Sequence, residues 1–180
     1  ADLFADAGLR LAQELIWEKQ NGSNFHADRF KRVHELVVQF YPAERRWREI
    51  YNVVQTTAEA TARAVRHKQR PPHTGNIDAG YYVSHDGGPR IMRSVVFVRN
   101  CHGRAIHPTE KPVALLEIVI RTSCPPGGLV GDWFAGSGSV GEACRLSGRR
   151  YVGCEIDAEM AEHARARLAA VLPFDNGGAT

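Results

Sequence analysis

The sequence predicts an α/β fold, because two short apolar strands flank a glycine-rich turn and a helix. The stretch Leu129–Ser139 contains a short buried strand followed by a turn punctuated by glycine, and a helix opens at Val140. About twenty residues after the turn, Tyr151–Ile156 forms a second apolar strand with Glu155 near its end. In α/β sheets this arrangement builds a crevice for a nucleotide-like ligand at the carboxyl ends of the strands.

The chemistry of the turn favours a nucleoside that carries an amino acid rather than phosphates. Glycines allow the backbone to turn tightly and to approach a ligand closely, and the helix start offers free N–H groups. Glu155 is placed to accept hydrogen bonds from ribose hydroxyls. Asp132 would repel a pyrophosphate but would attract an ammonium group. These features together point to S-adenosylmethionine.

Two motifs resemble those of the β-class amino DNA methyltransferases (N6-adenine or N4-cytosine). The segment His107–Pro112 is similar to that family's His-Pro-Thr-Glu/Gln-Lys-Pro motif, and Asp132–Ser139 is similar to its cofactor loop. Ile16–Lys19 and Arg29–Phe40 match upstream segments in the same order. The resemblance implies a Rossmann-like methyltransferase fold that depends on S-adenosylmethionine. It also implies that the fold is incomplete here, with central strands missing.

The family's catalytic tetrapeptide, Asp/Asn/Ser-Pro-Pro-aromatic, is not found in the sequence. The two Pro-Pro pairs lie in Arg70–His73 and Cys124–Gly127, and neither has both the polar and the aromatic member. In the family this motif precedes the segment that contains Trp17 and Lys19, so we expect it upstream of Ala1. We therefore expect no catalytic residue in this chain, which would be the C-terminal portion of a larger protein. The alternative is a degenerate, inactive relative.

The turn and the resemblance together predict a cofactor site. Glu155 is expected at the ribose and Asp132 at the ligand, while Phe134 fits equally well in the core or against adenine. The family places the segment with Thr109 and Lys111 at the methionine end of the cofactor. Asp157 is expected to cap the last helix rather than to bind the ligand. The predicted cofactor-binding residues are Asp132, Phe134, Ala135, Gly136, Ser137, Gly138, Ser139, Glu155, Thr109 and Lys111.

Basic residues concentrate in the middle of the chain. Between Ala43 and Arg104 there are eleven Lys or Arg against five Asp or Glu, and elsewhere twelve against fifteen. The family inserts its variable target-recognition region there, so the resemblance implies contact with double-stranded DNA, whose phosphates such side chains neutralise. The candidate DNA-binding residues are Arg63, Arg66, Lys68 and Arg70. The alternative is a solvated helix face, because 58–70 is rich in alanine with basic residues at helical spacing.

The expected organisation has four parts: terminal strands and hairpin of the catalytic region (1–42), the basic insert (43–92), the cofactor-binding region (93–172) and a tail (173–180). The patterns predict a hairpin of Leu11–Lys19 with Val33–Phe40, a helix over Glu44–Arg70, an irregular Pro71–Pro89 and a strand in Ile91–Val98. They also predict that Thr109 caps a helix with Pro112 in its first turn and an apolar stretch over Val113–Ile120. The closing helix is expected over Ala158–Val171, and Gly8 is expected to end a short first helix.

Composition allows one domain with a substantial core, since 43% of the 180 residues are apolar. No apolar run is long enough to cross a membrane, and no secretory signal is present. The four cysteines form no C-x-x-C pair, so we expect no metal site, and we expect reduced, mostly buried thiols in a cytoplasmic protein.

The resemblance implies an enzyme that transfers a methyl group from S-adenosylmethionine to an exocyclic amino group of a DNA base. Adenine N6 is preferred over cytosine N4 on family frequency. This chain would supply the cofactor-binding and target-recognition parts. The expected partners are double-stranded DNA and a complementing segment or chain, and a homodimer is allowed. The alternatives are a non-catalytic DNA- or cofactor-binding module and a dinucleotide-dependent oxidoreductase that shares only the strand, turn and helix.

Overall fold

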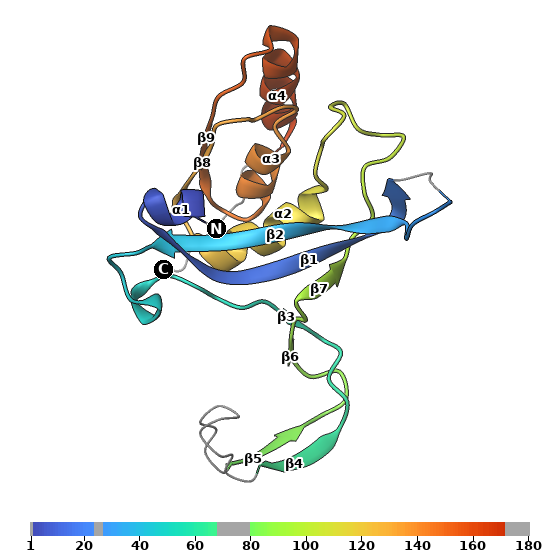
Figure 1. Cartoon of the computed structure of the whole chain (residues 1–180), viewed down its shortest axis with the longest axis vertical. Helices are drawn as coiled ribbons and strands as arrows, with labels where there is room; N and C mark the ends of the chain where they lie inside the picture. The colour runs from blue at the N-terminus through green and yellow to red at the C-terminus, as the bar shows by residue number, and fades with distance from the viewer. Residues whose placement is uncertain (1, 24–26, 68–79, 172–180) are drawn as a thin grey trace. The chain divides into compact units, whose positions relative to one another are not determined.

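The computed structural model describes residues 2–23, 27–67 and 80–171. The chain divides into two compact units, and Figure 1 shows the elements of each. Unit 1 combines residues 1–53 with 93–180, and unit 2 comprises Val54–Met92. Residues 43–53, which the sequence grouped with the basic insert, therefore lie in unit 1.

A long antiparallel hairpin forms one sheet of unit 1. Strands β1 (Leu9–Ser23) and β2 (Arg32–Pro42) pair from Leu9 opposite Pro42 to Ser23 opposite Arg32. Strand β7 (Val95–Phe97) joins β1 in parallel, which gives the order β2-β1-β7. The predicted hairpin is confirmed, although β1 continues to Ser23, beyond the end predicted at Lys19. The short helix α1 (Asp2–Asp6) precedes it and is followed by Gly8, whose φ is 72°, as predicted.

The second sheet of unit 1 carries the glycine turn. Strands β8 (Leu129–Asp132) and β9 (Arg150–Gly153) are parallel, and helix α3 (Ser139–Leu146) connects them. Ala143 and Cys144 of α3 are buried against Ile120 of helix α2 (Val113–Ser123). The predicted order of strand, turn and helix is confirmed, and this core holds it in place. The expectation that the strand is buried is wrong, because no residue of β8 is buried and Leu129 is 56% exposed.

Helix α4 (Ala158–Ala170) closes the unit and packs on α3. The Asp157 side chain accepts hydrogen bonds from the backbone nitrogens of Glu159 and Met160, at 2.9 and 3.0 Å. Asp157 is thus the predicted N-cap, and it satisfies two of the amide groups that a helix start leaves without partners.

Unit 2 is a two-stranded ribbon made of two antiparallel ladders. Strand β3 (Thr56–Thr57) pairs with β6 (Arg90–Ile91), and β4 (Arg63–His67) pairs with β5 (Gly80–Ser84). The chain bends between the ladders, where the Ala60 nitrogen donates to the Gly88 carbonyl and the Gly87 nitrogen to the Ala60 carbonyl, at 3.2 and 2.9 Å.

The predicted helix over Glu44–Arg70 is wrong for the described part of that range. In residues 44–67 the structure has the 3₁₀ turn η1 (Trp47–Glu49), extended segments and two strands. The alanine and arginine content favoured a helix locally, but pairing with β5 overrides that weak preference. The prediction of an irregular Pro71–Pro89 is likewise wrong for 80–84, which form β5, and residues 71–79 lie outside the described residues.

Two further element predictions need correction. Thr109 does not cap α2, because that helix begins at Val113 after Pro112, an extended N-cap residue without a side-chain cap bond. Proline fits a helix start, since it lacks the N–H that would have no partner there. The strand predicted within Ile91–Val98 is divided between β6, which ends at Ile91, and β7 of unit 1.

The four cysteines are free thiols, but only Cys144 is buried, so the prediction of mostly buried thiols is wrong. Burial raises the pKa of Cys144 to about 11. Within the described ranges, no three His, Cys, Asp or Glu side chains come together as metal ligands, and no helix could span a bilayer.

Candidate functional site

The glycine turn is pinned to the segment that follows β9. The Cys154 nitrogen donates to the Asp132 carbonyl, and the Ala135 nitrogen donates to the Cys154 carbonyl, both at 2.9 Å. The Asp132 side chain also contacts the backbone of the turn, since its Oδ1 accepts from the Phe134 nitrogen at 3.1 Å. Two backbone bonds and one side-chain bond thus fix the start of the turn.

Glu155 lies against this turn. Its Oε2 accepts from the Gly136 nitrogen at 2.6 Å, and its Oε1 accepts from the Asp157 nitrogen at 3.0 Å. These amides of Asp157 and Gly136 lower the pKa of Glu155, so the carboxylate is ionised at neutral pH. The structure therefore brings together Glu155 and Gly136, the acidic residue and the glycine that the sequence predicted to share a site.

The glycines of the turn serve the packing of this chain. Gly138 has a φ of 79°, and a Cβ at that position would lie 2.9 Å from Cα and Cβ of Ala164 in α4. A Cβ at Gly141 would lie 2.7 Å from the Leu168 side chain and 2.8 Å from the ring of Tyr151. Gly136, Gly138 and Gly141 also have the Gly-x-Gly-x-x-Gly spacing of dinucleotide sites, so spacing alone does not identify the ligand. Asp132 is the feature that disfavours a pyrophosphate.

Ser137 belongs to a buried ionic network. Its hydroxyl donates to Glu110 Oε2 at 2.7 Å and accepts from Arg167 Nη1 at 2.9 Å. Arg167 also forms ion pairs with Glu110 at 2.7 Å and with Glu142 at 3.0 Å. The Glu110 side chain is 4% exposed, and its burial raises the pKa. Hydrogen bonds from Arg167 and Ser137 outweigh this effect, so the pKa of Glu110 is lowered on balance.

This network joins the His107–Lys111 segment to the turn. Glu110 Oε2 accepts from the Ile106 nitrogen at 3.1 Å, which fixes the start of the segment. The His107 ring would lie 3.5 Å from a Cβ placed on Gly136, and the Thr109 hydroxyl lies 3.1 Å from His107 Nδ1. The two predicted motifs, far apart in sequence, therefore meet in one place.

Lys111 reaches a second charged group. Its ammonium lies 3.2 Å from Glu35 Oε2, and the Lys19 ammonium lies 2.9 Å from Glu35 Oε1. Both ammonium groups lie within 6 Å of the Trp17 ring centroid, at 5.9 and 5.4 Å. Trp17 is 2% exposed and donates to the Val98 carbonyl at 2.8 Å. The indole, the shared carboxylate and the two lysines connect β1 and β2 to the His107–Lys111 segment.

Large apolar side chains are exposed around the turn. Phe134 is 91% exposed, and Trp133 and Ile156 are also exposed, beside the turn and directly after Glu155. Ile156, Glu110 and Arg167 were not predicted as site residues. Glu110 lies inside a recognised motif and could have been found there. Arg167 carried no local signal, because it lies 57 positions from Glu110.

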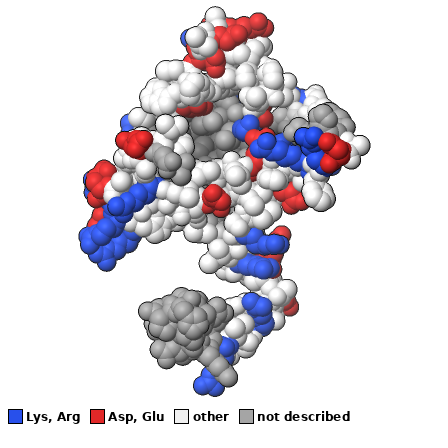
Figure 2. Space-filling view, in the orientation of Figure 1, with Lys and Arg blue, Asp and Glu red and all other residues white. Residues whose placement is uncertain are grey.

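The candidate DNA-binding residues do not form one surface. Arg63 and Arg66 lie on β4, and residues three apart on a strand face opposite sides of the sheet. Arg63 shares a face with Tyr82, to whose hydroxyl it donates at 2.9 Å, whereas Arg66 is paired with Tyr81. On the face shown in Figure 2, Lys and Arg side chains are exposed along unit 2. Lys68 and Arg70 lie outside the described residues.

Comparison with known sequences covers most of the chain. A family profile described as DNA methylase matches residues 1–166. DNA adenine methyltransferase YhdJ of Escherichia coli (strain K12) is 45% identical over 62 residues, which are 34% of this chain and 21% of that protein. YubD of the same strain, named as a methylase, is 46% identical over 69 residues, or 38% of this chain and 30% of that protein. The chain thus matches less than a third of the length of either relative.

Solved structures agree with the fold. The M1.HpyAVI–SAM complex has a TM-score of 0.63 and 22% identity, over 93% of this chain and 67% of that one. The cytosine-N4-specific PvuII DNA methyltransferase has a TM-score of 0.59 and 16% identity, over 98% of this chain and 55% of that one. These similarities confirm the predicted Rossmann-like methyltransferase fold.

Proposed function

This chain belongs to the DNA methylase family, and we propose that it is the cofactor-binding and target-recognition part of a DNA methyltransferase. The proposed donor is S-adenosylmethionine, and the proposed acceptor is an exocyclic amino group of a base in double-stranded DNA. Family membership confirms the resemblance inferred from the His107–Pro112 and Asp132–Ser139 motifs. The activity itself is proposed for the whole protein, because the matched region is at most 30% of the curated relatives.

The position of Glu155 is the observation that carries this proposal. Its carboxylate is ionised and held by the amides of Gly136 and Asp157, yet each oxygen has a further lone pair for a hydroxyl donor. Two adjacent ribose hydroxyls are the donors that suit such a carboxylate. Phe134 in the turn and Ile156 directly after Glu155 are both exposed, and we propose that they supply apolar surface for an adenine ring. The residues present therefore fit an adenosine.

We propose that three other predicted residues serve the amino acid end of the same ligand. Asp132 provides negative charge for an ammonium group, and we propose Thr109 and Lys111 for the carboxylate. The Glu110–Arg167 network supports this arrangement, because it holds the His107–Lys111 segment against the turn. Ser137 contributes through the same network, since its hydroxyl is engaged by Glu110 and Arg167.

The bound cofactor would supply an activated methyl group, and the chain would hold that group in the orientation that transfer requires. The target base must leave the duplex to reach the donor. We propose adenine N6 as the acceptor in preference to cytosine N4, which the name and 45% identity of YhdJ support. We further propose that this chain alone is inactive, because its sequence lacks the Asp/Asn/Ser-Pro-Pro-aromatic tetrapeptide.

Calorimetry with the 180-residue chain tests the cofactor. We expect binding of S-adenosylhomocysteine, the demethylated cofactor, and no binding of NAD. Binding of NAD alone would contradict the proposal and favour the oxidoreductase alternative, which the glycine spacing by itself permits.

A second candidate function is a non-catalytic cofactor- and DNA-binding module, which the missing tetrapeptide favours. Transfer of radioactive methyl groups to DNA distinguishes the two when the intact parent protein is used. A parent with an Asp-Pro-Pro-Tyr-like motif and measurable transfer would exclude the module. A parent that binds both ligands without transfer would establish it.

A further inference from the structure

Several hydrogen bonds connect the two strands of the unit 2 ribbon at its bend. Besides the backbone bonds at Ala60, the Asp86 carboxylate accepts from the Ala62 nitrogen at 2.7 Å. The Ser84 hydroxyl donates to the Thr61 carbonyl at 2.6 Å. Ala60 is only 8% exposed. These contacts continue the connection between the two strands of the ribbon from one ladder to the next.

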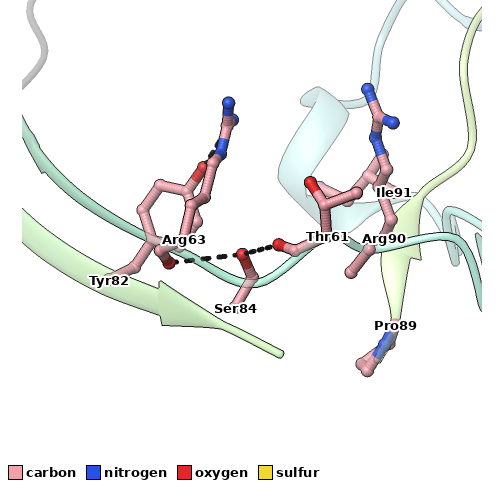
Figure 3. Close-up of a pocket in the computed structure, with 8 residues that line it drawn as sticks. Thr61, Arg63, Tyr82, Ser84, Pro89, Arg90 and Ile91 are labelled. Atoms are coloured by element: carbon pink, nitrogen blue, oxygen red, sulfur yellow. Dashed lines mark hydrogen bonds between the residues drawn. The ribbon is translucent and has the colours of Figure 1, made fainter. Parts of the chain in front are cut away.

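A cavity of about 390 Å³ opens at this bend. Its volume is within the range of small-molecule sites, roughly 300–1,000 Å³. The side chains that line it come from both strands of the ribbon, as Figure 3 shows. They are Ala60, Thr61, Arg63, Tyr82, Ser84, Pro89, Arg90 and Ile91.

Two guanidinium groups flank the cavity. Arg63 lies on β4 and Arg90 on β6, and Figure 3 shows both side chains extending to the same side of the ribbon. Among the described residues neither forms an ion pair. The Tyr82 hydroxyl accepts from Arg63 Nη2 at 2.9 Å, which restrains that side chain without neutralising its charge. A site with two such charges and an exposed aromatic ring suits a ligand that is anionic at one end and flat or apolar at the other.

We propose that this cavity binds one backbone phosphate of DNA together with the nucleoside next to it. Arg63 and Arg90 hold the phosphate, and Tyr82, Pro89 and Ile91 contact the sugar and base. The inference rests on the proposed function, which makes DNA the partner of unit 2, and it assigns the contact to one face of the ribbon.

The chemistry of the side chains supports a phosphodiester. A planar guanidinium matches two phosphate oxygens at once, which an ammonium cannot do. Contacts to phosphates fix the position of a protein on the duplex without reading its sequence. Ile91 is 70% exposed and Tyr82 is 41% exposed, so the apolar part of the cavity is accessible to a ligand of this size. Arg66, which the sequence pattern made a candidate for DNA binding, pairs with Tyr81 on the other face of β4 and does not line the cavity. The proposal therefore assigns it no phosphate contact, and it serves as the matched control.

The test measures fluorescence anisotropy of a labelled DNA duplex with the full chain across a salt series. We expect Arg63→Gln and Arg90→Gln each to weaken binding by about tenfold at low salt, and each to reduce the slope of log affinity against log salt by about 0.9. Arg66→Gln removes the same charge and should leave both quantities near wild type. Thermal unfolding checks that each variant is folded, and Arg90→Gln tests the site independently if Arg63→Gln disturbs β4.

Equal weakening by Arg66→Gln and the other two variants would overturn the proposal, because it would show a bulk charge effect. Failure of the wild-type chain to bind DNA would overturn it as well. Calorimetry with S-adenosylhomocysteine on the same proteins separates the two proposals. A chain that shows the expected arginine pattern but does not bind S-adenosylhomocysteine supports the cavity and contradicts the proposed function.

Discussion

The carboxylate of Glu155 and the backbone amide of Gly136 meet in a 2.6 Å hydrogen bond across 19 positions of sequence. This contact joins the carboxyl end of β9 to the turn after β8, and the Asp157 amide holds the second carboxylate oxygen at 3.0 Å. The carboxylate is therefore oriented by the protein before any ligand arrives. Such preorganisation reduces the entropy that binding must overcome.

Replacement of Glu155 tests whether this carboxylate binds the ribose. We expect Glu155→Ala to weaken S-adenosylhomocysteine binding by about tenfold or more, because charge-assisted hydrogen bonds to two hydroxyls are lost. The affinity of Glu155→Gln should lie between those of wild type and Glu155→Ala, since the amide keeps one acceptor oxygen. Isothermal calorimetry measures both, and Glu162→Ala, on the exposed surface of α4, is the control. Unchanged affinity in Glu155→Ala would place the ribose elsewhere.

Substitution of Gly138 tests the close approach of α4 to the turn. Gly138→Ala should lower the free energy of unfolding by about 2–4 kcal/mol, because it combines a left-handed backbone with a Cβ 2.9 Å from Ala164. Gly127 has a similar φ of 71° with no atom within 4 Å, so Gly127→Ala isolates the backbone cost, about 1–2 kcal/mol. Urea denaturation gives both values. Equal losses would mean that α4 moves away without cost.

Local sequence patterns were sufficient to predict the cofactor half of the fold. The strand, turn and helix around Gly136, the N-cap at Asp157 and the hairpin of β1 with β2 are each specified by residues near one another in the chain. Turn glycines and caps act within a few positions, so their patterns are visible in the sequence.

Contacts between distant segments could not be predicted from local sequence patterns. Residues 58–67 have a composition that favours a helix, yet β4 forms because β5 pairs with it. Arg63 and Arg66 consequently point to opposite faces, and a surface that looked continuous at helical spacing is divided. The Glu110–Arg167 pair joins positions 57 apart, with no periodic signal between them.

The acid sensitivity of unit 1 should depend on Glu110. Burial raises its pKa, but hydrogen bonds from Arg167 and Ser137 lower it below the ordinary value of 4.5. A carboxylate with a lowered pKa stabilises the folded state above its unfolded pKa, and this contribution is lost as the pH falls through the folded pKa. Stability of the wild-type chain should therefore decline as the pH drops below about 4.5.

Glu110→Gln should be less stable than wild type at neutral pH by about 1–3 kcal/mol, because the amide cannot form the ion pair with Arg167. Its stability should also depend less on acid pH, because the amide has no proton to gain there. Urea denaturation at several pH values measures both effects. Glu117→Gln removes the carboxylate of the exposed Arg121 pair and should change stability little. Parallel pH curves for Glu110→Gln and wild type would show that the buried network does not control acid unfolding.

Replacement of Lys111 tests whether this lysine binds the carboxylate at the amino acid end of the ligand. Its ammonium is held between Glu35 Oε2 at 3.2 Å and the Thr109 carbonyl at 3.1 Å, and its side chain is 39% exposed. If it receives the ligand carboxylate, Lys111→Ala should weaken S-adenosylhomocysteine by about tenfold, in keeping with loss of a charge-assisted bond. Methylthioadenosine, which lacks that carboxylate, should bind the variant and the wild type equally. Lys31→Ala removes the same charge at an exposed position before β2 and should affect neither ligand. Equal weakening of both ligands by Lys111→Ala would instead indicate that this lysine supports the fold through Glu35 and Trp17.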